Sequence, residues 1–304
     1  MTPRYRANST VEQWRILQAV VDFGGYAQAA SALNKSQSSL NHAVAKLQTV
    51  LGVQLLELQG RKAVLTQAGL VLLRRSRSLT AQIEQLETLA SNLEQGWEPE
   101  IHLSREILYP TTALYQALTQ FYPESRGSRV VITDNVLSGS SEAVNNRQFD
   151  LVITGRIPAG HHGTPLGTVA LILVCGANHP LAALEFIDES RLAQELQIVI
   201  RDTGSQANKE LGWLKAEQRW TLSNFHEALA ILKQNVGFCW VPEAMAAQAI
   251  NDGELVHLRN SNVGGAVVPM SLVIPRPEQL GPAANRFAEL IVANCLGLSS
   301  PTNF

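Results

Sequence analysis

The sequence predicts an α/β protein with a small basic helical module, a long helix and a larger domain of alternating strands and helices. Its 304 residues are 45% hydrophobic and 16% charged, an ordinary globular composition with enough chain for two or three domains. Residues 1–80 carry ten Lys or Arg against three acids, whereas residues 81–304 carry fourteen against twenty-three. Helical periodicity fills residues 11–94, and short apolar runs alternate with helical segments from residue 98 onward.

Several classes of protein are excluded by composition. No apolar run approaches the length of a membrane-spanning helix, and the N-terminus lacks the apolar region of a secretory signal. Cys175, Cys239 and Cys295 are far apart without CxxC spacing, which argues against a disulfide framework or a thiolate metal site. We therefore expect a cytoplasmic protein without cofactor or metal. The charge split predicts one module that meets a polyanion and another that does not.

Three short helices are predicted first. A Ser-Thr pair can cap a helix that starts at Val11 and ends before Gly24. A second helix fits residues 26–33, where alanines permit close packing, and Ser36 can cap a third over residues 37–51. Two short helices joined by a tight turn indicate a helix-turn-helix, although a three-helix bundle with a merely solvated polar face would show the same helical pattern.

The second helix of such a motif enters the major groove of DNA, where polar side chains reach base edges. The residues expected to contact DNA from this helix are Ser36, Gln37, Ser38, Asn41, His42 and Lys46. Alternating residues at 53–58 and 62–65 predict a hairpin beside it, and a hairpin in this position is a wing. Arg61 and Lys62 at its tip suit phosphate or minor-groove contact.

Thr66 can cap a longer helix that has a seven-residue period. Its seam consists of Leu65, Leu72, Leu79, Leu86 and Leu93, with Ser76, Ile83 and Ala90 at the intervening heptad position. Pairing with the same helix of a second subunit would bury this seam and place two recognition helices about one DNA turn apart, which suits an inverted-repeat site. The alternative is an amphipathic helix that packs on its own domain.

Residues 24–69, GGYAQAASALNKSQSSLNHAVAKLQTVLGVQLLELQGRKAVLTQAG, resemble the LysR-type transcriptional regulators. The shared order is a small-residue helix, a Ser-Gln turn into the recognition helix, Leu-Gly-Val, and Gly-Arg-x-x-x-Leu-Thr-x-x-Gly. The segments 178–181 and 236–238, the latter before Pro242, are similar to the family's effector domain.

The resemblance implies a winged helix-turn-helix at 1–65, a linker and dimerisation helix at 66–96, and an effector-binding domain at 97–304. That domain would resemble a periplasmic binding protein, with lobe I at 98–170 and 270–304, lobe II at 171–269, and two crossover strands between them. A homodimer that assembles into a homotetramer, contact with RNA polymerase, and control by a small molecule are also implied.

Three positions depart from the family pattern. Ser38 stands where Pro is usual, His42 where Arg is frequent, and Leu58 where the wing commonly has Arg. Fewer fixed cations predict weaker nonspecific DNA binding and a shallower salt dependence. A small-molecule sensor with a vestigial DNA-binding module is therefore the alternative function. An enzyme is not expected, because the sequence has no nucleophile elbow, phosphate-binding loop or metal-ligand spacing.

In open α/β sheets, ligands bind beyond the carboxyl ends of the strands, which here means the cleft between the lobes. The residues expected to contact the effector are Ser104, Arg105, Glu106, Asn135, Ser138, Ser140, Asp202, Ser205, Ser223 and Phe225. Serine hydroxyls and free N–H groups at helix starts favour an anion, as does Arg105. Glu106 or Asp134 would instead favour an amine or a zwitterion, so the expected effector is anionic or zwitterionic.

Overall fold

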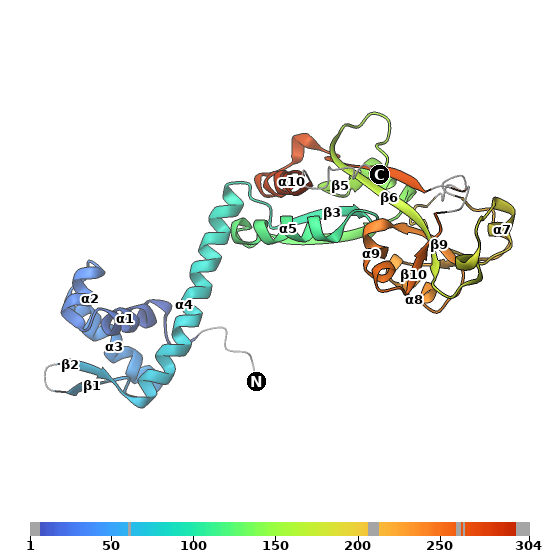
Figure 1. Ribbon diagram of the computed structural model, residues 1–304. Helices are drawn as coiled ribbons and strands as arrows, with labels where there is room; N and C mark the ends of the chain where they lie inside the picture. The colour runs from blue at the N-terminus through green and yellow to red at the C-terminus, as the bar shows by residue number, and fades with distance from the viewer. Residues whose placement is uncertain (1–6, 60–61, 206–212, 260–262, 264, 296–304) are drawn as a thin grey trace, which may run out of the picture. The chain divides into compact units, whose positions relative to one another are not determined.

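The structure, a computed structural model, describes residues 7–59, 62–205, 213–259, 263 and 265–295. The chain divides into two compact units, Met1–Ser91 and Asn92–Phe304 (Figure 1). Each unit has a hydrophobic core of its own. Within the described ranges, no helix combines the length and apolar character needed to cross a bilayer.

The first unit contains three short helices, a hairpin and most of a long helix. Its elements are α1 (Val11–Asp22), α2 (Tyr26–Ala32), α3 (Gln37–Leu51), β1 (Leu56–Gln59), β2 (Lys62–Leu65) and α4 (Gln67–Glu94). Leu17, Leu40 and Leu47 are fully buried at its centre. The helices therefore form where the apolar stripes of the sequence can face one another.

Side-chain caps fix where these helices begin. The Thr10 hydroxyl accepts a hydrogen bond from the Gln13 amide at 3.3 Å, and the Gln13 side chain accepts one from the Thr10 amide at 2.9 Å, which makes a capping box. The Ser36 hydroxyl caps α3 by accepting from the Ser39 amide at 3.2 Å. Between α2 and α3 the chain reverses at Asn34, which has a φ of 51°.

The hairpin is shorter than the sequence pattern predicts, because β1 starts at Leu56 rather than at residue 53. The Gln48 side chain of α3 accepts hydrogen bonds from the amides of Leu55 and Leu56, at 2.7 and 3.0 Å. These bonds tie the start of β1 to α3, while the Leu55 carbonyl accepts from the Thr66 amide at 3.0 Å. The antiparallel register then runs from Leu56 opposite Leu65 to Gln59 opposite Lys62.

The first part of α4 packs on its own unit. The Thr66 hydroxyl accepts from the Gly69 amide at 2.9 Å, which is the predicted cap. Ser76 and Thr80 are buried, and the Gln18 amide group of α1 donates to both hydroxyls at 3.2 Å. The heptad pattern assigns Ser76 to the seam between subunits, and this assignment is wrong, because that side of the helix covers α1.

The second unit is a mixed sheet with helices on both lobes. Its main elements are β3 (Glu100–Glu106), α5 (Thr111–Phe121), β4 (Arg129–Asn135), α6 (Ser138–Asn146), β5 (Leu151–Thr154), β6 (Gly163–Gly176), α7 (Glu189–Ala193), β7 (Gln197–Ile200), β8 (Arg219–Leu222), α8 (Phe225–Leu232), β9 (Phe238–Pro242), α9 (Glu243–Asn251), β10 (Leu255–His257), β11 (Ala266–Val273) and α10 (Pro282–Cys295). Three short 3₁₀ turns occur at Tyr122–Glu124, Pro180–Ala183 and Pro277–Gln279.

Two long strands connect two parallel sets of strands. The sheet order is β4-β3-β5-β11-β6-β9-β7-β8, and β10 pairs with β6. In the first lobe β3 is parallel to β4 and β5, and in the second β7 is parallel to β8 and β9. β6 and β11 run antiparallel to each other and to their outer neighbours, so they are the crossovers between the lobes (Figure 1).

Each lobe has aromatic side chains in its core. In the first, Phe121 of α5 lies 5.1 Å from Phe287 of α10 between ring centroids. In the second, Trp213 lies 5.9 Å from Phe238 and 5.4 Å from Trp240. Glu106 at the end of β3 and Val136 just after β4 line a cavity between the lobes, as the rule for the carboxyl ends of parallel strands predicts.

Candidate functional site

The exposed face of α3 carries all the side chains that were expected to contact DNA from this helix. Leu40, Val44 and Leu47 are buried in the unit's core. The residues left exposed are Ser36, Gln37, Ser38, Asn41, His42 and Lys46. Because Gln37 and Asn41 are four residues apart, they lie one above the other on the same face of the helix. The arrangement is a polar, solvent-open surface on a rigid helix.

The neighbouring turn and hairpin frame this face. Lys35, in the turn before α3, forms an ion pair with Glu12 of α1 at 2.5 Å. A hollow of about 610 Å³ between α2, α3 and the hairpin is lined by Gln37 and Asn41, among others. Lys62 begins β2, and Arg61 lies outside the described residues.

Farther along α4, three seam leucines are exposed. Leu79, Leu86 and Leu93 have 57%, 64% and 48% of their surface exposed. These leucines are seven residues apart, which is the spacing of a coiled-coil interface. A single chain therefore leaves an apolar stripe uncovered.

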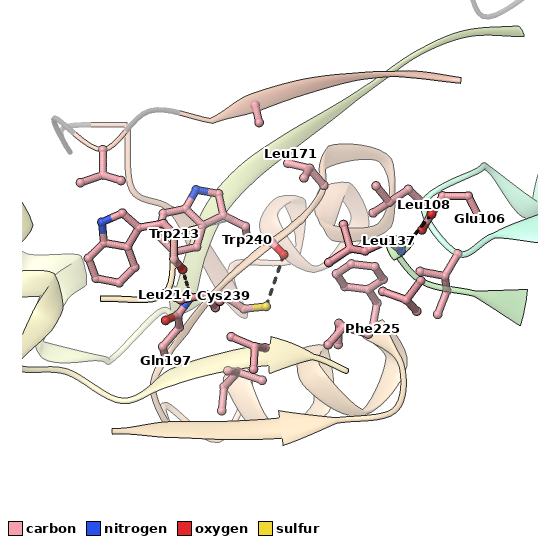
Figure 2. A pocket seen from close by; sticks show the side chains of 17 residues that line it. Glu106, Leu108, Leu137, Leu171, Gln197, Trp213, Leu214, Phe225, Cys239 and Trp240 are labelled. Carbon is pink, nitrogen blue, oxygen red and sulfur yellow. Dashed lines mark hydrogen bonds between the residues drawn. The ribbon is translucent and has the colours of Figure 1, made fainter. Parts of the chain in front are cut away.

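A cavity of about 270 Å³ lies between the two lobes of the second unit. The first lobe contributes residues around Glu106 and Leu137, and the second contributes β7, Phe225 and the aromatic residues Trp213 and Trp240 (Figure 2). A second hollow, of about 640 Å³, shares residues including Glu106 with the first and extends past Ser138 and Ser140 to residues 155–159. The two hollows are neighbours and share part of their lining, and Arg156 lines the second hollow but not the first.

Glu106 is the ionisable carboxyl group in this cavity. The end of β3 places it where it is 2% exposed. Its Oε2 accepts hydrogen bonds from the Ser140 hydroxyl at 2.8 Å and the Leu137 amide at 3.1 Å. Burial raises the pKa of Glu106 to about 7, and the Ser140 hydroxyl and neighbouring backbone amides lower that pKa by less. Its Oε1 accepts no hydrogen bond from any described residue.

Gln197 is a second buried polar group in the lining. It begins β7 and is 2% exposed. Its Nε2 donates to the Trp213 carbonyl at 2.6 Å, while its Oε1, like that of Glu106, has no partner in the described part of the chain. In Figure 2, Glu106 lies at one end of the cavity, and Gln197 lies with Trp213 and Trp240 at the other.

The structure brings some of the expected effector contacts into the cleft. Glu106, Ser138, Ser140 and Phe225 line it. The lining residues that sequence reasoning missed include Gln197 of β7, Trp240 of β9, and Trp213 in the segment before β8. A polar Gln at the start of an apolar strand was the one signal that could have indicated a lining position.

Other residues that were expected to contact the effector lie outside the cavity lining, and some of them bond to other side chains of the protein. Arg105 forms a bidentate ion pair with Asp134, at 2.7 and 2.6 Å, on the face of β3 opposite to Glu106. Ser104 is buried and accepts from the Asn135 amide group at 2.8 Å. Ser223 lies before α8 and is exposed to solvent there.

Asp202 and Ser205 connect the lobes directly. The Ser138 hydroxyl of α6 donates to the Asp202 carboxylate at 2.7 Å, and the Ser205 amide donates to the Glu142 carboxylate at 3.0 Å. The loops approach so closely that a Cβ on Gly204 would lie 2.1 Å from the Ser138 hydroxyl oxygen. Small residues are therefore needed where the lobes meet.

The cysteines are buried thiols. Burial raises the pKa of Cys175 and of Cys239 to about 12, so both stay protonated at neutral pH. Cys239 contributes to the lining of the cavity as a small apolar group.

Comparison with known families identifies both units. Residues 11–70 match the bacterial regulatory helix-turn-helix protein, lysR family, and residues 94–296 match the LysR substrate binding domain. The chain belongs to the LysR family of transcriptional regulators. This LysR-type regulator is therefore not an enzyme, and its family binds DNA and small-molecule effectors and forms oligomers.

Individual relatives agree with this assignment. YeeY, an uncharacterized HTH-type transcriptional regulator of Escherichia coli K12, is 27% identical over 252 residues, which cover 79% of this chain and 80% of that protein. YhaJ, a probable HTH-type transcriptional regulator of the same strain, is 27% identical over 252 residues, which cover 81% of this chain and 84% of that protein. The solved structure of full-length LysG from Corynebacterium glutamicum with bound effector Arg is 16% identical and has a TM-score of 0.52. The match covers 95% of this chain and 98% of LysG, and it shows that the two chains share a fold.

Proposed function

We propose that this LysR-type regulator reads an inverted-repeat duplex with α3 and responds to a small molecule held between its lobes. The observation that carries the proposal is a cavity lined from both lobes in a chain whose recognition helix leaves every expected DNA contact exposed. A regulator of this kind would act in the cytoplasm, beside the DNA. The sensor with a vestigial DNA module finds no support among the relatives.

Base reading would centre on Gln37 and Asn41. Both side chains offer a paired donor and acceptor, which match the major-groove edge of adenine. Phosphate contacts would come from the remaining polar and basic groups, which are Ser36, Ser38, His42, Lys46, Arg61 and Lys62. Phosphate contacts position the helix, and base contacts select the sequence.

Pairing through α4 would present this surface twice. The exposed leucines Leu79, Leu86 and Leu93 form the stripe that a second copy would cover. We propose a homodimer through this helix, its further assembly to a homotetramer, and RNA polymerase as the downstream partner.

Effector binding would act through the contacts between the lobes. A molecule in the cleft touches both lobes, while Ser138–Asp202 and Ser205–Glu142 hold them together at its rim. An effector changes the output if it favours one lobe arrangement over the other. Four further residues stay proposed effector contacts in a second arrangement of the lobes: Ser104, Arg105, Asn135 and Ser223.

The test is selection of duplexes from a random pool with the full chain, followed by titration of the preferred duplex and a random one at several salt concentrations. We expect an inverted repeat that is bound about 10³-fold or more tightly than random duplex. Equal affinity for every duplex at every salt concentration would contradict the proposed function and favour a sensor.

A further inference from the structure

The inter-lobe cavity has an unusual combination of lining groups. Aromatic and aliphatic side chains form most of its wall, including Trp213, Phe225 and Trp240. Two buried oxygens in the lining, Oε1 of Glu106 and Oε1 of Gln197, accept no hydrogen bond from the described residues. No Lys, Arg or His occurs among the described residues that line this cavity.

The Gln197 oxygen is an acceptor, and Oε1 of Glu106 is an acceptor when the carboxyl is ionised, so a donor at each end of a ligand would satisfy both groups. A buried acceptor without a partner destabilises a protein, which favours a ligand that supplies the missing donor. An anion would bring further acceptors next to Glu106, and the described wall of this cavity holds no cation to compensate, since Arg156 lines the adjoining hollow. A cation would pair with the Glu106 carboxylate, and an apolar body attached to it would pack against Trp213 and Trp240 at the other end of the cavity.

The size of the cavity limits the body of such a ligand. A cavity of about 150 Å³ accommodates benzene. The volume of about 270 Å³ therefore suits a one- or two-ring aromatic body with a short arm. Because Glu106 and Gln197 lie at opposite ends in Figure 2, two donors would have to be at opposite ends of that body.

We infer that the effector is a small aromatic or apolar amine, whose ammonium group pairs with Glu106 and whose far end donates a hydrogen bond to Gln197. This inference rests on the proposed function, since it names the chemical class of the molecule held in the same cleft. The sequence predicts an anionic or zwitterionic effector, and the inference departs from the anion that helix starts and Arg105 favour while keeping the amine that Glu106 favours. The raised pKa of Glu106 agrees with a carboxyl that lacks a cationic partner in the unliganded chain.

The experiment is calorimetric titration of the full chain with three probes: 2-phenylethylamine, tryptamine and the matched carboxylate 3-phenylpropanoate. We expect both amines to bind, and the carboxylate to bind at least about tenfold more weakly or not at all. Absence of binding by both amines, or tighter binding of the carboxylate, would overturn the inference.

Two variants locate the amines. Glu106→Gln keeps the shape of the side chain and removes its charge, which suits an apolar surrounding. The variant should weaken the affinity for both amines about ten- to a hundredfold. Its matched control is Glu227→Gln, an exposed carboxyl in the first turn of α8, which should leave the affinities unchanged. Equal affinity of the wild-type chain and Glu106→Gln for the amines would contradict the assignment of the cavity.

Gln197→Leu tests the second donor. Tryptamine has an indole N–H at its far end and 2-phenylethylamine has no such donor, so the variant should weaken tryptamine alone. An equal change for the two amines would refute the role of Gln197. Circular dichroism of each variant establishes that a weaker affinity does not come from unfolding.

Adding the same probes to the DNA titration separates the inference from the proposed function. If the amines bind through Glu106 but leave DNA binding unchanged, the ligand class stands and effector control by this cleft fails. If the amines do not bind and 3-phenylpropanoate changes DNA affinity, effector control stands and the inference is overturned.

Discussion

The recognition surface of α3 and the inter-lobe cavity are built in opposite ways. The recognition surface draws its side chains from one helix, and all of them are polar and exposed. The cavity draws on both lobes and the crossover strands, and its two polar end groups, Glu106 and Gln197, are each 2% exposed. The two sites therefore contrast a solvated polar helix face with a largely apolar pocket whose two polar end groups are buried.

The largest expected effect concerns whether the recognition surface works only as a pair. Leu86→Asp places a charge in the exposed stripe of α4, and burial of one leucine stabilises by about 1.5–3 kcal/mol, which a symmetric dimer gains twice. We expect the variant to sediment as a smaller species and to bind an inverted repeat no better than random duplex. Gln85→Asp, exposed one position away, is the matched control. An unchanged mass for Leu86→Asp in analytical ultracentrifugation would show that α4 does not pair through this stripe.

The next prediction concerns the desolvation of the cavity. The pKa of Glu106 is raised from 4.5 to about 7, so between these values the folded chain keeps a proton that the unfolded chain releases. The contribution of Glu106 to the free energy of unfolding should therefore be greatest below pH 4.5, fall as the pH rises to about 7 by up to about 3 kcal/mol, and level off above that pH.

Urea denaturation at several pH values measures this dependence as a difference between chains. Glu106→Gln should remove the fall, because its side chain does not titrate, whereas Glu227→Gln should retain it. If the free energy of unfolding had the same pH dependence in the wild-type chain and Glu106→Gln, Glu106 would be solvated in the folded protein. The cavity would then not differ from the α3 surface in its desolvation.

The same contrast explains what could be predicted from the sequence. Caps at Ser36 and Thr66 and the apolar period of α3 are local patterns, and the structure has the helices in these places. The start of β1 could not be predicted in this way, because it depends on the hydrogen bonds of Gln48 with the amides of Leu55 and Leu56.

The crossover strands and the cavity depend on packing between distant residues. β6 begins at Gly163, well before its apolar part, and a register shift between Met270 and Ser271 lies opposite its Pro165 and Gly167. One-residue alternation along β3 sends Glu106 to the cavity and Arg105 to the other face. The Trp residues of the cavity meet through the sheet topology, which no local pattern shows.

A smaller effect is expected at the base-reading positions. Asn41→Ala should weaken binding to the preferred duplex by about 1–3 kcal/mol, or about 5- to 150-fold, and leave binding to random duplex nearly unchanged. Thr49→Ala, exposed on the same helix, controls for helix stability. Equal weakening on both duplexes, measured by fluorescence anisotropy, would show that Asn41 does not read a base.

The smallest effect is expected at Lys46, and it separates the two kinds of interaction within the recognition surface. Lys46 is exposed near the end of α3, and an ion pair with a phosphate there carries no sequence information. Lys46→Ala should weaken all duplexes alike and reduce the slope of log affinity against log salt by about 0.9 for each phosphate that Lys46 neutralises. Lys215→Ala, in the second unit beside Glu189, removes the same charge and should leave the slope unchanged. If Lys46→Ala acted on the preferred duplex alone, Lys46 would belong with Asn41 among the base-reading residues, and the polar face of α3 would be more selective than its composition indicates.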